Sequence, residues 1–246
     1  MTKRTAKIII GTLAAVLFVV VAVLLTLLFF GVIHLNHPDP DEFPVRGVDL
    51  SSWQGAVDWE VLASQDIRFA FIKATEGSSF VDPQFDDNWA AAAQTDLRIG
   101  AYHFFSFESS GHAQAELFCR TVSRVERMLP PVVDVEYYGK FRSEKDIDLP
   151  AVRQELRALI DALTAAYGTK PILYADGASY RTIIRGAFDD CGLWFRSVYT
   201  RAPSDVTWQF WQYSNRHVLQ GYEGEERYID MNVFAGSAEA FETYPY

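Results

Sequence analysis

The pattern of apolar and polar residues divides the chain into two parts. Residues 8–33 contain no charged side chain, whereas the later residues alternate short apolar runs with amphipathic stretches. As a helix rising about 1.5 Å per residue, this segment would be about 39 Å long, more than the roughly 30 Å of a bilayer's hydrocarbon core. The pattern therefore predicts one transmembrane helix, tilted or frayed at its ends, ahead of a folded domain.

A cleaved signal peptide is the alternative interpretation of this segment. Signal peptides have an apolar core of about 7–15 residues and end at a small-x-small site. The run here is longer, and its end at residues 30–34 (FGVIH) offers no such site. We therefore favour a retained anchor. Because Lys3, Arg4 and Lys7 precede the span, residues 1–7 are expected in the cytoplasm and the following domain outside the cell membrane.

Beyond the span, the sequence predicts a linker and then one α/β domain. Residues 34–45 are rich in proline and acids and are predicted to form a stiff, solvated spacer. In the domain, residues 46–246, strands are predicted at 47–50, 69–74, 99–107, 132–137, 171–175, 193–199, 208–213 and 229–234. Helices are predicted between the first six strands, at 59–64, 85–95, 111–125, 149–167 and 179–188. This alternation favours a modified (β/α) barrel of eight strands and about five helices, with its chemistry at the carboxyl ends of the strands.

Charge and cysteine content narrow the partners of the domain. All 32 acidic residues but only 19 of the 22 basic ones lie beyond the span, which gives that part a formal charge of −13. Such a surface argues against nucleic acid as a partner, and recognition of an anionic cell wall would have to come from a groove. Cys119 and Cys191 could pair in an oxidising compartment, but we favour two separate buried thiols because a domain of this size needs no disulfide.

Two acids separated by one residue stand out in the segment 130–138 (PPVVDVEYY). Side chains alternate along a strand, so Asp134 and Glu136 should share one face, with Cα atoms about 6.6 Å apart. Carboxylates this close repel, which raises one pKa and keeps one group protonated near neutral pH. Glycosidic cleavage uses a protonated acid beside an ionised carboxylate. Two solvated acids on a surface strand are the alternative, and the apolar flanks argue against it.

Two further acids lie between apolar residues on the first and last predicted strands. Asp49 and Asp230 would converge on the same pocket if the barrel closes, because its first and last strands are then neighbours. Either acid alone could equally be a turn or cap residue. Together with Asp134 and Glu136 they form the predicted set of four catalytic carboxylates.

Aromatic residues on or just after the predicted strands are candidates for binding sugar rings. About half of them should instead be core residues, because aromatic side chains are common in cores. The candidates are Trp53, Tyr102, Phe105, Tyr137, Tyr174, Trp211 and Tyr213. The histidines have no metal-ligand spacing, and no phosphate-binding loop or serine-nucleophile motif occurs, so neither a metal nor a cofactor is predicted.

In their order along the chain, these segments resemble the family-25 glycoside hydrolases, the Chalaropsis-type lysozymes. The resemblance covers residues 47–234 and rests on 47–55 (GVDLSSWQG), 71–77 (FIKATEG), 82–85 (DPQF), Asn88, 100–104 (GAYHF), 134–136 (DVE), 211–214 (WQYS) and 230–232 (DMN). It implies a flattened (β/α) barrel that hydrolyses the β-1,4 bond between N-acetylmuramic acid and N-acetylglucosamine. Glu136 matches the family's acid, and Asp49, Asp134 and Asp230 match its other active-site carboxylates.

One strand departs from the family pattern. Where the family often has L-W-x-A-x-Y, residues 193–199 read LWFRSVY. Arg196 could alter the groove there by meeting a carboxylate of the peptide stem. No wall-binding module is evident, so the membrane anchor would take its place.

The expected activity is peptidoglycan hydrolysis by a membrane-anchored monomer, with peptidoglycan and the lipid bilayer as its partners. Glu136 would protonate the leaving oxygen and later activate water, in a retaining reaction. Asp134 could act as the nucleophile or orient the substrate's own 2-acetamido group, and we favour the second route. The alternatives are a glycosidase of other bond specificity, such as a glucosaminidase or chitinase, and a non-catalytic membrane-tethered glycan-binding protein.

Overall fold

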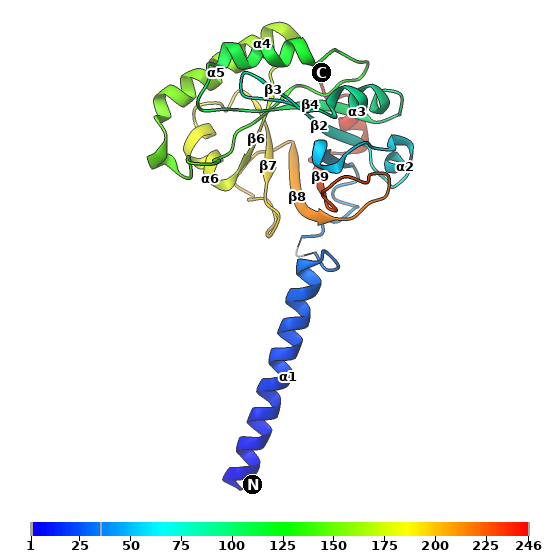
Figure 1. The fold of residues 1–246 in the computed structure, drawn as a ribbon, viewed down its shortest axis with the longest axis vertical. Helices are drawn as coiled ribbons and strands as arrows, with labels where there is room; N and C mark the ends of the chain where they lie inside the picture. Colours follow the sequence, from blue (N-terminus) through cyan, green and yellow to red (C-terminus); the bar gives the residue numbers. More distant parts are fainter. Residues whose placement is uncertain (1, 35, 246) are drawn as a thin grey trace. The chain divides into compact units, whose positions relative to one another are not determined.

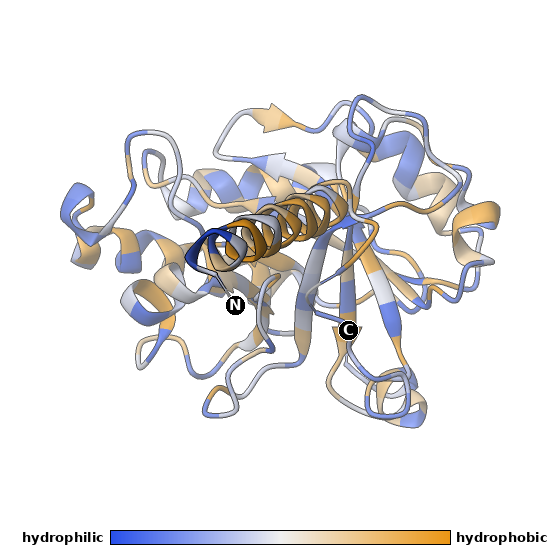
Figure 2. Ribbon diagram, turned by 90° about the horizontal axis from the view of Figure 1, so that it is seen from below, coloured by the Kyte–Doolittle hydropathy of each residue, from blue (hydrophilic) through white to orange (hydrophobic). Residues whose placement is uncertain are grey.

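The computed structural model describes residues 2–34 and 36–245 and contains two compact units, Met1–Leu35 and Asn36–Tyr246 (Figure 1). The first unit is dominated by α1 (Lys3–Phe29), which begins at an N-cap where the hydroxyl of Thr2 accepts the backbone N–H of Thr5. No residue of α1 is buried, and the helix is coloured hydrophobic along most of its length, with a hydrophilic N-terminal end (Figure 2). By length and composition α1 could cross a membrane, a property that signal sequences share.

The second unit is a closed barrel of eight strands, which confirms the predicted fold class. Around the ring the order is β1-β9-β8-β7-β6-β5-β4-β2, and β1 pairs with β2 to close it. The strands are β1 (Arg46–Leu50), β2 (Phe69–Glu76), β4 (Arg98–Phe104), β5 (Val132–Asp134), β6 (Ile172–Asp176), β7 (Gly192–Arg196), β8 (Phe210–His217) and β9 (Ile229–Phe234). The short β3 (Phe80–Val81) pairs only with β2, outside the ring.

All neighbouring strands of the ring are parallel except those next to β9. This last strand runs antiparallel to β8 and to β1, so no crossover helix is needed between β8 and β9. Because β1 and β9 are paired, residues from the two ends of the domain's sequence lie side by side.

Helices cover the outside of the barrel (Figure 1). They are α2 (Trp59–Ala63), α3 (Phe85–Ala92), α4 (Gly111–Thr121), α5 (Leu149–Tyr167) and α6 (Gly177–Ser179), with one-turn 3-10 segments at Ser52–Gln54 and Glu144–Asp146. The last helix, α7 (Ala238–Glu242), packs Phe241 against Phe69 and Phe234 at the end of the barrel where the strands begin. The helix predicted at 179–188 is wrong in type and length: α6 is followed by a π turn at Tyr180–Ile184. The prediction for α5 is confirmed residue for residue, because Asp148 caps its start and Gly168, in the left-handed conformation, ends it.

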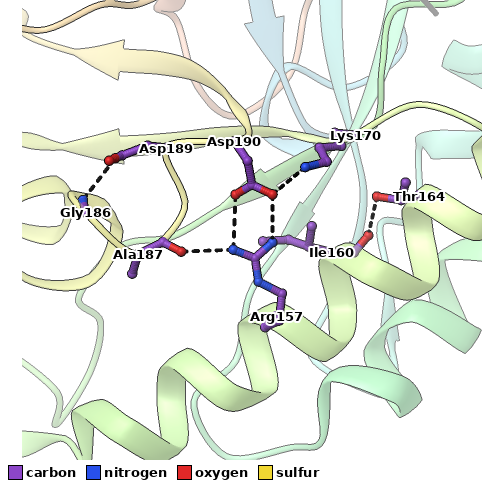
Figure 3. Close-up of polar contacts among 8 residues, drawn as sticks. All are labelled: Arg157, Ile160, Thr164, Lys170, Gly186, Ala187, Asp189 and Asp190. Atoms are coloured by element: carbon purple, nitrogen blue, oxygen red, sulfur yellow. Dashed lines mark hydrogen bonds and ion pairs between the residues drawn. The ribbon is translucent and has the colours of Figure 1, made fainter.

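An ion-pair cluster fastens α5 to the segment before β7 (Figure 3). The two terminal nitrogens of Arg157 each lie 3.1 Å from a carboxylate oxygen of Asp190, and the Lys170 ammonium binds the same carboxylate. Hydrogen bonds from Arg157 and Lys170 lower the pKa of Asp190. Because the Asp190 side chain is 41% exposed, solvent screening limits the contribution of the cluster to about 1 kcal/mol.

Aromatic side chains fill the end of the barrel where the strands begin. Phe71 stacks on Trp194 with a centroid separation of 4.6 Å, and Phe69 and Phe210 pack beside them. A side chain at Gly47 would place its Cβ 2.4 Å from the Phe69 ring, so glycine is what leaves room for this packing. The end of the barrel where the strands begin is therefore filled by core side chains, and an open site can form only at the carboxyl ends of the strands.

The segment before β1 is not the solvated spacer that its composition predicts. Asn36 is buried and its amide donates to the backbone oxygens of Ser197 and Thr200 at 2.8 and 2.9 Å. Phe43 is also buried and packs against Trp208 and Trp211. Although prolines and acids dominate the composition of this segment, the buried side chains of Asn36 and Phe43 hold it against the folded unit. The folded unit therefore begins at Asn36 rather than at residue 46.

The two cysteines are both free thiols. The preference for separate thiols over a disulfide is confirmed, but the expectation that both are buried is not. Cys119 is exposed on α4 and Cys191 is half-buried.

Candidate active site

Asp49 and Asp230 face each other across the junction of β1 and β9. Their Cα atoms are paired in the antiparallel register, and both side chains are half-buried. The amide nitrogen of Gln212, on β8, donates to one oxygen of each, at 2.9 Å to Asp49 and 3.0 Å to Asp230. The Gln212 oxygen in turn accepts the hydroxyl of Tyr174, on β6, at 2.9 Å. One buried amide thus holds two acids from opposite ends of the domain.

A second buried amide fixes Asp49 from the other side. Asn232, two residues after Asp230 on β9, donates to Asp49 at 2.7 Å and accepts the indole N–H of Trp194 at 2.8 Å. Asn232 and Gln212 are both inaccessible to solvent, and each is satisfied by an aromatic donor and a carboxylate acceptor. Such fully paired networks hold side chains in one geometry.

Asp134 and Glu136 lie at the end of β5, but they do not share a regular strand as predicted. β5 ends at Asp134, whose Cα pairs with those of Phe104 and Tyr174. The next backbone N–H, of Val135, still bonds to Tyr174 at 2.9 Å, and Glu136 follows in irregular chain. Asp134 is buried and Glu136 is half-buried. One oxygen of Asp134, Oδ1, is buried without a hydrogen-bond partner among the described residues.

The four carboxylates are close enough to affect one another's protonation. Burial raises the pKa of Glu136 to about 7, and the charge of Arg196 opposes the rise. Burial also raises the pKa of Asp49 to about 6, against the hydrogen bonds from Asn232 and Gln212. The pKa values of Asp134 and Asp230 lie well above the ordinary range, first through burial and then through the charges of Glu136 and Asp49 respectively. Near neutral pH the group therefore carries fewer than four negative charges, so protonated and ionised carboxyls coexist.

A cavity of about 540 Å³ opens beside the Asp49–Asp230 pair. Its lining combines residues from β1, β4, β7 and β9 with the loop after β1, the end of β8 and the connection from β8 to β9. The lining residues are Asp49, Leu50, Ser51, Trp53, Gln54, Tyr102, Arg196, Asn215, Arg216, Glu226, Tyr228 and Asp230. Trp53 is 63% exposed, so much of its side chain is available to a ligand.

The structure separates the seven aromatic candidates into two groups. Trp53 and Tyr102 line the cavity, Tyr174 lies beneath it as the donor to Gln212, and Tyr137 is half-buried near the end of β5. Phe105, Trp211 and Tyr213 belong to the core between the barrel and its helices, so the prediction that they bind substrate is corrected. On β8 the reason is that side chains alternate along a strand. Because Gln212 points into the barrel, Trp211 and Tyr213 on either side of it point outward.

Several residues of the site escaped the sequence reasoning. In the sequence, Gln212 and Asn232 stand out only as members of the motifs at 211–214 and 230–232, although Asn232 shares a strand face with Asp230. Lys73, on the inner face of β2, forms an ion pair with Glu76 at 2.7 Å, and its charge lowers the pKa of Asp134. Within residues 2–34 and 36–245, no group of three or more His, Cys, Asp or Glu side chains is arranged to hold a metal ion.

A largely parallel barrel with paired carboxyls at the carboxyl ends of its strands is an arrangement that suits a glycoside hydrolase. The chain belongs to glycosyl hydrolases family 25, whose model matches residues 48–222. Lysozyme M1 of Streptomyces globisporus is 32% identical over 220 residues, covering 80% of this chain and 70% of that protein. The protein is therefore an enzyme of the lysozyme type.

Solved structures agree with this assignment. A family 25 glycosyl hydrolase from Bacillus anthracis superposes with a TM-score of 0.79 and 48% sequence identity, covering 86% of this chain and 97% of the other. A bacterial lysozyme from Streptomyces coelicolor superposes with a TM-score of 0.74 and 30% identity, covering 81% of this chain and 96% of the other.

Proposed function

We propose that this enzyme cleaves peptidoglycan at the β-1,4 bond from N-acetylmuramic acid to N-acetylglucosamine, with Glu136 as general acid and base. Peptidoglycan hydrolysis follows from the family and its lysozymes. The residue roles are supported by one observation above all: Asp134, the last residue of β5, and Glu136, just beyond it, lie within electrostatic reach of Asp49 and Asp230. Asp134 and Glu136 would act on the sugar. Asp49 and Asp230 would set the electrostatic potential around them.

In the proposed first step, Glu136 transfers its proton to the leaving oxygen while the bond from that oxygen to C1 of the muramic residue breaks. The carbonyl oxygen of the muramic 2-acetamido group attacks C1 and forms a cyclic oxazolinium intermediate. A carboxylate that accepts the acetamido N–H would stabilise the positive charge that develops there. Asp134 would take that role in its ionised form, which the charge of Lys73 favours, through the buried Oδ1 that has no hydrogen-bond partner among the described residues.

In the second step, Glu136, now ionised, removes a proton from water as the water oxygen attacks C1. The oxazolinium ring opens, which restores the acetamido group, and the configuration at C1 is retained. Gln212 and Asn232 hold Asp49 and Asp230 in place. The negative charge of these two acids would help to keep the pKa of Glu136 near 7.

The full chain in detergent micelles, incubated with purified peptidoglycan, tests the bond assignment. The fragments are reduced with borohydride and their new ends are identified by mass spectrometry. Reduced muramic acid ends support the proposal. Reduced glucosamine ends would retain a glycosidase but overturn the bond, and glycan binding without any new ends would indicate a non-catalytic binding protein.

The pKa of Glu136 predicts the alkaline limb of the activity profile. A general acid works only while protonated, so kcat/KM should fall about tenfold per pH unit above pH 7, near the pKa of about 7. Because the four carboxyls of the site interact, the apparent pKa of this limb belongs to the group and not to Glu136 alone. The profile is measured as initial rates on soluble glycan fragments between pH 4 and 9. A limb beginning near pH 4.5, the ordinary value for glutamate, would contradict Glu136 as the acid.

We further propose that α1 is a retained single-pass anchor, with residues 1–7 in the cytoplasm and the enzyme unit outside. The uncharged run at 8–33 supports a membrane span, and the three basic residues before this run support the orientation. In spheroplasts, an external protease should cleave the enzyme unit and leave α1 in the membrane fraction. Recovery of a chain that lacks α1 from the culture medium would indicate a signal peptide instead.

A further inference from the structure

Arg196 occupies a position in the cavity that no catalytic step uses. It is the last residue of β7, with its Cα paired to those of Asp176 and Gln212. Trp194, two residues earlier on the same inner face, packs in the aromatic core, so Arg196 lies one pleat closer to the open end of the barrel. Its side chain is half-buried and lines the cavity.

The guanidinium of Arg196 forms no hydrogen bond or direct ion pair with any residue that the structure describes, although acids surround it. It interacts through space with Glu136, Asp176 and Asp230. A guanidinium carries five donors in a planar fork, and partly buried charges are normally hydrogen-bonded. The donors of Arg196 that face the cavity are therefore available to a ligand.

Two other arginines of the enzyme unit, Arg98 and Arg153, form the hydrogen bonds that the Arg196 guanidinium lacks. Arg98 donates to the carbonyl oxygens of Arg127 and Tyr244 at 3.1 and 2.9 Å. Arg153 donates to those of Ile183 and Thr182 at 2.9 and 2.8 Å. Each of these side chains is held by backbone acceptors. Arg196 points its charge into an open cavity instead.

The end of the next strand reinforces the positive character of this side. Asn215 and Arg216, on β8, line the same cavity, and the Arg216 guanidinium lies 5.3 Å from the ring centre of Tyr228. Strands β7 and β8 thus contribute two guanidinium groups and an amide, whereas β1 and β9 contribute Asp49 and Asp230. A planar carboxylate is the anion that a guanidinium fork fits best among the groups of a glycan strand, because it can accept two parallel hydrogen bonds.

We propose that Arg196 binds a carboxylate of the glycan substrate and thereby selects muramic acid over N-acetylglucosamine. The inference rests on the proposed function. Muramic acid carries a lactyl ether whose acid group is a free carboxylate in peptide-free strands and an amide where a peptide stem is attached. In the second case the carboxylates belong to the stem. N-acetylglucosamine has neither group, so one arginine can distinguish the two sugars of the strand.

Binding to a catalytically silenced enzyme tests this proposal apart from hydrolysis. The full chain carrying Glu136→Gln is titrated in detergent micelles with muramic acid–glucosamine oligosaccharides of three kinds. The first has free lactyl carboxylates, the second has them converted to neutral methylamides, and the third carries peptide stems. Each titration is repeated with Arg196→Gln added, with Arg196→Lys added, and with Arg120→Gln as a surface control.

We expect Arg196→Gln to weaken binding of at least one carboxylate-bearing ligand 10-fold or more, since hydrogen bonds between charged groups are the strong ones. Binding of the methylamide should change less than twofold. Arg196→Lys should recover part of the loss, and the Arg120→Gln control should show none. A loss confined to the first ligand identifies the lactyl group as the source of the carboxylate, and one confined to the third identifies the stem.

An equal loss for all three ligands, or no loss for any, would overturn the proposal. In the first case Arg196 would act only through the neighbouring acids. Failure of the parent to bind any of the ligands would contradict the proposed function as well. New muramic acid ends in the hydrolysis assay, combined with carboxylate-independent binding, would leave the proposed function standing and remove only this inference.

Discussion

Replacing Glu136 with glutamine should lower kcat on peptidoglycan by about 10³-fold, within the range that general acid–base catalysis contributes. Glutamine keeps the shape of the side chain but has no proton to give to the leaving oxygen and cannot remove one from water. KM should change little, because glutamine keeps the size of the side chain and the proton of Glu136 is needed only as the bond breaks. The measurement is the initial rate of release of new reducing ends, compared with that of the unmodified enzyme.

The control for this substitution is Glu116→Gln on the exposed face of α4, where the side chain is 74% exposed. It makes the same chemical change away from the barrel and should leave kcat within twofold. Loss of folding cannot account for the expected effect, because Glu136→Gln removes a carboxyl that burial disfavours in its ionised form. Above pH 7 the variant should unfold at the same temperature as the parent or higher. Retention of a tenth or more of the parent's kcat would contradict the role of Glu136.

Replacing Asp134 with asparagine should lower kcat by about 10²–10³-fold, as removal of a preorganised electrostatic partner does in other enzymes. In the proposed route the carboxylate stabilises positive charge on the acetamido nitrogen as the oxazolinium forms, and a neutral amide cannot. Glycan whose acetamido groups have been deacetylated should slow the parent enzyme by a similar factor. The two changes together should cost little more than either alone, because both remove the same interaction.

The alternative role of Asp134, as a nucleophile, predicts a different observation. A covalent sugar on Asp134 would then accumulate with a slowly hydrolysed substrate, and the intact mass of the denatured enzyme would show it. Deacetylated glycan would remain a good substrate in that case. Either result would replace the substrate-assisted route while leaving Glu136 as the acid.

The long apolar helix and most of the barrel could be predicted because their signals are local. α1 is apolar on every side, so its length alone indicates a possible membrane span. The buried residues of α5 recur at helical spacing between a capping Asp148 and a terminating Gly168, which fixes both of its ends. Alternation of strands with helices then indicates a parallel sheet, and Asp134 and Glu136 stand out as acids in an apolar setting.

Other features could not be predicted because they depend on which segments meet when the barrel closes. Docking of Asn36 needs backbone oxygens about 160 residues away, near Ser197 and Thr200. The outward turn of Trp211 and Tyr213 depends on the register of β8, and a shift by one residue would have placed both in the barrel. Periodicity cannot choose between these registers when apolar and aromatic residues surround a single glutamine.

The sequence by itself determined the fold class, the apolar span and the acids available for catalysis, because composition and spacing are properties of neighbouring residues. The tertiary structure alone decided how these acids are held and charged. Gln212 bridges Asp49 to Asp230 only because β8, β9 and β1 are adjacent in the ring. Burial then raises the pKa values of all four acids and leaves the charge of Arg196 facing the cavity. Desolvation and long-range pairing are properties of the closed barrel, and no short segment of the chain contains them.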